Sequence, residues 1–115
     1  MNFLVSKTHA GKIKEQVKKY VKPPPQVTVA SGAGYKFWEL VRGDHDVYVH
    51  SEQIKKWNLC AGAALMRTSN GRLTDLKGDE IDFKSQFDYA VEDGILASKY
   101  EHHDLVKALR KIIKD

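Results

Sequence analysis

Residues able to do chemistry gather in three short segments, each where an apolar strand-like run gives way to a helical pattern. These segments are residues 6–9, 31–36 and 55–58. In open α/β sheets ligands bind at the carboxyl ends of strands, where loops lead into helices. The segment 31–36 has the most chemical content, because its glycines admit close backbone approach and the helix N-terminus that follows favours an anion. Lys36 adds a compact positive charge there, so the sequence predicts an anion-binding site.

A plainer interpretation stays open at each of these positions. Segment 31–36 also fits a tight strand-to-helix turn with a solvated lysine, and the usual Gly-rich nucleotide fingerprints do not occur. His9 could donate to a phosphate or simply lie on the surface. Asn58 stands where a helix is expected to begin, so its side chain could cap that helix or hold a ligand. The tandem His102 and His103 could suggest metal, but adjacent helical residues point apart, so we expect a solvated surface.

The elements that must position these residues follow from apolar periodicity and turn residues. Short β-branched or apolar runs predict strands at residues 2–6, 27–30, 46–50, 72–75 and 94–98. Helical stripes predict helices over residues 10–22, 35–42, 57–68 and from about 104 onward, whereas residues 79–93 receive no assignment. Alternating strands and helices imply an α/β layer fold around a mixed, mostly parallel sheet flanked by helices.

The helix expected over residues 57–68 is apolar nearly all round, which predicts that it is buried. One face carries residues at i, i+3, i+4, i+7, i+8 and i+11, namely Trp57, Cys60, Ala61, Ala64, Leu65 and Thr68. Within such a helix Cys60 is expected to be an inert, buried small hydrophobe. Asn70 and Gly71 then break the helix.

Composition bounds the remaining choices. The 115 residues suggest one domain with its own core. No apolar run approaches a membrane span. The formal net charge of +4 is compatible with an anionic partner without requiring one. The lysine-rich first helix could meet nucleic acid electrostatically, but it lacks interleaved aromatic residues, so we expect a solvated face and no nucleic-acid partner.

Residues 55–81, KKWNLCAGAALMRTSNGRLTDLKGDEI, resemble the C-terminal signature of the inositol monophosphatase superfamily. That signature reads tryptophan-aspartate, small residues, a gly-gly turn and T-D-x-x-G. Residues 5–11, 31–36 and 94–98 match further motifs in the same order. Together they look most like the bisphosphate nucleotidase branch, whose Golgi-resident form removes the 3′-phosphate of adenosine 3′,5′-bisphosphate. The similarity spans about residues 3–109.

The resemblance implies a layered αβαβα architecture, in which residues 1–115 correspond to the C-terminal domain. It implies a Mg²⁺-dependent phosphomonoesterase acting on a small phosphorylated substrate, adenosine 3′,5′-bisphosphate or an inositol phosphate. His9, Gly32 and Lys36 match residues that contact substrate in the nucleotidase branch. Asn58 stands where the family places a metal-binding aspartate.

Two departures from the family pattern bear on activity. The family's N-terminal metal-binding domain, with its glutamate ligand and D-P-[LI]-D-[GA]-T segment, has no counterpart in the sequence. Asn58 offers a neutral amide where Mg²⁺ prefers a carboxylate. We therefore expect a C-terminal fragment with no catalytic residue of its own, inactive alone and able to form a homodimer through an uncovered apolar face. The alternative is a non-catalytic pseudo-phosphatase domain that binds nucleotide or a protein partner. The compartment stays open.

Overall fold

The computed structural model describes residues 2–6, 10–30, 33–50, 54–56, 59–81, 83, 90–91, 94–99 and 102–114. Strands and helices alternate along most of this length. They are β1 (Asn2–Ser6), α1 (Ala10–Tyr20), β2 (Gln26–Ala30), α2 (Ala33–Arg42), β3 (Val47–His50), β4 (Ile54–Lys55), α3 (Cys60–Thr68), β5 (Arg72–Asp75), β6 (Ala90–Val91), β7 (Ile95–Ser98) and α4 (His102–Lys114).

Five strands form one mixed sheet in the order β2-β1-β3-β7-β5. β1 pairs in parallel with both β2 and β3. β7 runs antiparallel to both β3 and β5, so β5 points the same way as the first three strands. Four of these five strands therefore share one direction, which confirms the predicted mixed, mostly parallel sheet. β4 and β6 form a separate two-stranded ribbon.

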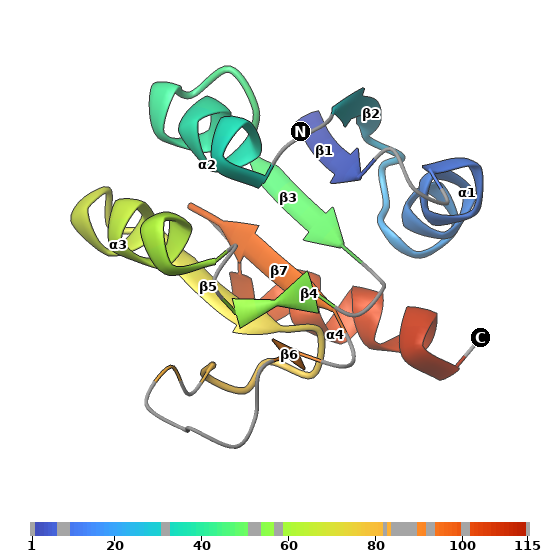
Figure 1. Ribbon diagram of the computed structural model, residues 1–115. Helices are drawn as coiled ribbons and strands as arrows, with labels where there is room; N and C mark the ends of the chain where they lie inside the picture. Colours follow the sequence, from blue (N-terminus) through green and yellow to red (C-terminus); the bar gives the residue numbers. More distant parts are fainter. Residues whose placement is uncertain are drawn as a thin grey trace.

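Helices cover both faces of the sheet, which makes a three-layer sandwich (Figure 1). α1 and α4 cover one face, where residues such as Val17 and Leu109 share a core with the inward residues of β1 and β3. α2 and α3 cover the other face, where Phe37 and Met66 pack with Tyr48. Because side chains alternate across a strand, the neighbours Phe3 and Leu4 enter opposite cores.

The first three helices all begin at one edge of the sheet, beside the carboxyl ends of the parallel strands. α1 follows the end of β1, and α2 follows the end of β2. α3 ends shortly before Arg72, the first residue of β5. Because β5 runs in the same direction as β1, β2 and β3, Arg72 lies at the amino ends of these strands. α3 leads up to Arg72, so α3 begins at the carboxyl edge. The ends of β1 and β2 and the starts of α1, α2 and α3 therefore lie at this edge.

The predicted start of α1 at Ala10 and the predicted end of α2 at Arg42 are confirmed. α1 ends at Tyr20, two residues before the predicted end, and the three prolines at 23–25 follow it. α2 ends at Arg42 as predicted, and the next residue, Gly43, has a φ of +86° and an N–H bond to the carbonyl of Leu40, which together form a glycine C-cap. Asn70 adopts a φ of +62° in the turn after α3, as expected for a residue that tolerates the left-handed region.

The predicted burial of α3 is wrong for the face that the sequence singled out. Cys60, Ala61, Ala64 and Thr68 are exposed, and the buried residues of the helix are Gly62 and Met66. The cause is the close approach to α2: a Cβ atom on Gly62 would lie 2.3 Å from the ring of Phe37, so only glycine fits there. Cys60 is therefore an exposed thiol and not a buried hydrophobe.

Other differences lie in short or irregular segments. β4 and β6 form a ribbon that the sequence did not indicate, and β6 falls inside the unassigned stretch 79–93. Helix α4 begins at His102, two residues before the expected start. Within the ranges that the structure describes, no helix is long and apolar enough to cross a membrane.

Candidate functional site

The candidate substrate site lies at the carboxyl edge of the sheet, and Lys36 is the predicted site residue that the structure describes. It stands in the first turn of α2, immediately after the loop that follows β2. His9, Gly32 and Asn58 lie outside the described residues. Their assignment to substrate and metal therefore stays a prediction.

Lys36 is buried, with only 3% of its surface exposed. Its Nζ donates a hydrogen bond to the carbonyl oxygen of Ala30 at 3.1 Å, across the loop between β2 and α2. The same nitrogen lies 5.0 Å from the centre of the Tyr48 ring on β3. The Phe37 ring packs edge-on against Tyr48, with 5.4 Å between ring centres, and so helps to hold the Tyr48 ring in place beside Lys36. The predicted alternative, a solvated lysine, is wrong.

Burial lowers the pKa of the Lys36 ammonium group, because the charged form loses hydration. An ammonium group has three donors, and Ala30 accepts one of them. The carboxylates in the described part of the chain make no ion pair with Lys36. A desolvated cation of this kind at the carboxyl edge of the sheet attracts an anion, because the anion would neutralise its buried charge.

The start of α3 is described from Leu59 onward, and the helix begins at Cys60, three residues later than the predicted start at residue 57. Leu59 occupies the N-cap position and makes no side-chain cap hydrogen bond. Leu59 N–H instead bonds to the carbonyl of Lys56 at 2.9 Å. Asn58 itself lies outside the described residues.

A magnesium site does not emerge from the described residues. No group of three or more His, Cys, Asp or Glu side chains that could hold a metal ion occurs among them. Asp75, at the carboxyl end of β5, uses one carboxylate oxygen to accept N–H groups of Lys77 and Asp79, each at 2.9 Å. Its other carboxylate oxygen makes no hydrogen bond to a described residue, and the described residues show no site that assembles further ligands around it.

His102 is a buried polar residue that sequence reasoning placed on the surface. Its Nε2 lies 2.8 Å from the hydroxyl of Thr74, and its Nδ1 lies 2.7 Å from the hydroxyl of Ser98. Thr74 donates its hydroxyl hydrogen to the carbonyl of Asp75, so it must accept from His102 Nε2–H. His102 is therefore the Nε2–H tautomer, and its Nδ1 accepts from Ser98.

This histidine ties three elements together, and its neighbour does not. Thr74 belongs to β5, Ser98 to β7 and His102 to α4, while His103 is exposed. The prediction that adjacent histidines point apart was right, but the helix turns His102 inward. Ser98 lies four residues before His102 and gave a local signal, whereas Thr74 is 28 residues away and gave none.

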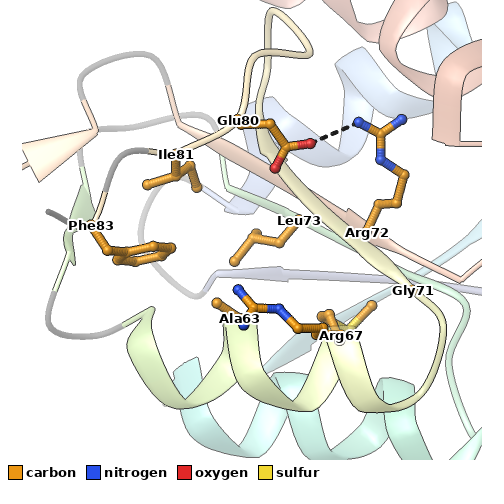
Figure 2. Close-up of a pocket in the computed structure, with 9 residues that line it drawn as sticks. Ala63, Arg67, Gly71, Arg72, Leu73, Glu80, Ile81 and Phe83 are labelled. Carbon is orange, nitrogen blue, oxygen red and sulfur yellow. Dashed lines mark hydrogen bonds and ion pairs between the residues drawn. The ribbon is translucent and has the colours of Figure 1, made fainter.

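A second cavity, of about 210 Å³, lies between α3 and β5 (Figure 2). Leu73 and Ile81 supply apolar lining, and Phe83 closes one side. Arg72 and Glu80 form an ion pair of 2.9 Å at its rim. No local sequence pattern indicates this cavity, because its lining comes from three separate places: α3, the start of β5, and the residues Glu80, Ile81 and Phe83.

These features define a class of protein. A three-layer sandwich with a mostly parallel sheet, three helix N-termini at its carboxyl edge and a buried lysine there is an α/β domain suited to anions. The chain belongs to the inositol monophosphatase family, whose model matches residues 2–114.

Two curated relatives show the range of the likeness. The chain is 38% identical to inositol monophosphatase 3 of Danio rerio over 113 residues, which is 92% of this chain and 33% of that protein. It is 34% identical to the Golgi-resident adenosine 3′,5′-bisphosphate 3′-phosphatase of Mus musculus, over 96% of this chain and 33% of that one. The chain thus spans about a third of the length of these relatives.

Solved structures show the same fold. An IMPase of Thermotoga maritima superposes with a TM-score of 0.75 at 20% identity, covering 98% of this chain and 41% of that one. An IMPase/NADP phosphatase crystallised with Mg²⁺ and phosphate gives a TM-score of 0.69 at 13% identity, covering 93% and 38%. The inositol monophosphatase fold expected from the sequence is confirmed.

Proposed function

We propose that this chain supplies a substrate-binding part of a phosphomonoesterase site, and that it binds the phosphate of a small phosphorylated molecule. Membership of a phosphatase family supports this proposal. The names of the two relatives suggest the substrate, which is adenosine 3′,5′-bisphosphate for one and an inositol phosphate for the other. The matching residues His9, Gly32 and Lys36 are the proposed contacts.

The observation that carries the proposal is the burial of Lys36. A lysine that is 3% exposed and has no ion-pair partner among the described residues costs stability, because its charge loses water. Its position at the carboxyl edge beside the N-terminus of α2 suits an incoming anion. A phosphate there would pair with the ammonium group and with the backbone N–H groups of the first helical turn.

The proposed role of this chain is binding and orientation, and bond cleavage is not assigned to it. Mg²⁺ chemistry is expected from the family resemblance, but the described residues do not fit the ion. At the family's carboxylate position Asn58 offers an uncharged oxygen. The chain alone is proposed to bind substrate without hydrolysing it. The same proposal includes two further expectations. Residues 1–115 form a C-terminal domain of such a phosphatase, and the chain forms a homodimer.

Calorimetric titration tests the binding. The 115-residue chain is titrated with adenosine 3′,5′-bisphosphate in the presence of a chelator, so that the heat reports metal-independent binding. We expect Lys36→Ala to weaken binding about tenfold or more, since a charge-assisted hydrogen bond to phosphate is lost. Lys36→Met keeps the length of the side chain and should weaken binding equally.

The matched control is Lys14→Ala, which removes one positive charge from an exposed position on α1. It should leave the affinity within about twofold, because surface charges contribute little. No heat at millimolar bisphosphate, or equal weakening by the Lys14 and Lys36 variants, would contradict the proposal.

A further inference from the structure

A basic cleft lies between helix α4 and the turn that follows β5, and Lys36 is not among the residues that line it. Its volume is about 250 Å³. Four cationic side chains line it, namely Arg72, Lys77, Lys107 and Arg110. The described lining holds one carboxylate, Asp79. Even with Arg72 paired to Glu80, the cations of the lining outnumber its carboxylate, so the cleft carries a net positive charge.

The floor of this cleft is fixed by a close contact between the turn and the helix. Gly78 has a φ of +93°, and a Cβ atom there would lie 3.0 Å from Cγ1 of Val106. The carboxylate of Asp75 holds the turn by accepting the N–H groups of Lys77 and Asp79. A larger residue at position 78 would push the turn away from α4, so glycine keeps the cleft in shape.

Two guanidinium groups in the cleft are already oriented. Arg110 donates from Nε and Nη2 to the carbonyl of Lys77, at 3.3 and 2.9 Å. Three of its five N–H donors are left for a ligand. Arg72 is held by Glu80 at 2.9 Å. Orientation before binding reduces the entropy that a ligand must offset.

Lys107 completes the cationic wall. It lies one turn of α4 before Arg110, so both side chains occupy the same helical face. Lys107 is exposed and has no hydrogen bond or ion pair with a residue that the structure describes. It is therefore available to a ligand without first breaking such a contact.

We propose that this cleft binds a small, hydroxylated phosphate ester, separately from the substrate site. The phosphate lies between Lys107 and the free edge of Arg110, because planar guanidinium donors match phosphate oxygens. A hydroxyl group of the ester donates to the carboxylate of Asp79. The volume of 250 Å³ falls below the roughly 300–1,000 Å³ of sites for drug-sized ligands, so the ligand is smaller than a nucleotide.

Residue-resolved NMR tests this second site. ¹H–¹⁵N spectra of the 115-residue chain are recorded while inorganic phosphate or glycerol 3-phosphate is added at constant ionic strength. We expect saturable shifts at the amides of Lys77, Gly78 and Asp79, with glycerol 3-phosphate the tighter ligand. Lys107→Ala should weaken glycerol 3-phosphate about tenfold, and Arg110→Lys should also weaken it, because the planar fork is lost.

Lys14→Ala is again the matched control, because it removes an equal charge from an exposed residue outside the cleft. Shifts that do not saturate, or equal weakening by Lys14→Ala and Lys107→Ala, would overturn the proposal. Shifts at Lys36 with none at the turn would assign the phosphate to the substrate site and would likewise overturn it. Equal affinity for inorganic phosphate and glycerol 3-phosphate would show that Asp79 does not accept a hydrogen bond from the ester, and would overturn the preference for a hydroxylated ligand.

Discussion

At the scale of single residues, the buried side chains of Lys36 and His102 differ in how far their hydrogen-bonding groups are satisfied. Lys36 keeps a cation at 3% exposure and hydrogen-bonds to one described acceptor, the Ala30 carbonyl. Such an arrangement costs folding free energy, and a phosphate that pairs with the ammonium group would offset the cost. His102 is satisfied at both ring nitrogens by Thr74 and Ser98. Its role is therefore structural.

His102 makes stability depend on pH. Burial and, to a smaller extent, the nearby charge of Arg72 lower its pKa from the usual 6.5 to about 4, against the opposing effect of Glu80. Between about pH 6.5 and 4 the unfolded chain binds a proton that the folded chain does not. The free energy of unfolding should therefore fall as the pH drops through this window, by up to about 1.4 kcal/mol per pH unit.

Urea unfolding at a series of pH values between 4 and 7 measures this slope, with His102→Gln and His103→Gln as a pair. The His102 variant should show a flatter dependence on pH. The His103 variant should keep the parent slope, because that side chain is exposed. An unchanged slope in the His102 variant would show that other groups cause the dependence.

Only part of the environment of Lys36 and His102 was predictable from the sequence. The position of Lys36 after a β-branched run and two glycines predicted an anion site, but its burial depends on Tyr48, which comes from another strand. The inward turn of His102 depends on Thr74, which is 28 residues away. Contacts between distant segments follow from the packed sheet and are not encoded in local spacing.

At the scale of elements, the close packing of α2 against α3 is decided by Gly62. A Cβ atom there would lie 2.3 Å from Phe37, a ring that is fully buried and cannot move aside. Gly62→Ala should therefore lower the free energy of unfolding by about 1–3 kcal/mol, even though alanine favours a helix. Denaturant titration measures the change.

Cys60→Ala is the control for this substitution, since it lies on the exposed face of the same helix. It should change stability by less than about 0.5 kcal/mol. Stabilisation by Gly62→Ala would mean that the two helices pack less closely than the structure shows.

The strands and helices were largely predictable from the sequence, whereas the buried face of α3 was not. Alternation and β-branched residues located β1, β2, β3, β5 and β7. In α3 the small residues gave an apolar pattern on several sides, so periodicity could not choose among them. The choice belongs to Phe37 on α2, whose ring occupies the space above Gly62.

At the scale of the molecule, this chain spans about a third of its curated relatives and forms one three-layer sandwich. Its carboxyl edge gathers the N-termini of α1, α2 and α3 together with Lys36, and no group of three or more His, Cys, Asp or Glu side chains that could hold a metal ion occurs among the described residues.

The 115-residue chain should therefore release no phosphate from adenosine 3′,5′-bisphosphate when Mg²⁺ is added. The reason is that the described residues lack a set of oxygen ligands for the ion. A colorimetric phosphate assay at millimolar Mg²⁺ checks this expectation, with and without lithium. Lithium-sensitive turnover by the purified chain would contradict it.

The most direct test of the central claim observes Lys36 itself. The side chain is labelled with ¹³C, and its Cε resonance is followed during titration with adenosine 3′,5′-bisphosphate, using Lys36→Met to assign the signal. We predict that the Lys36 resonance shifts and saturates with the ligand, and that the pKa of its ammonium group rises as the phosphate approaches. A Lys36 signal that stays still while the ligand binds elsewhere would contradict the account.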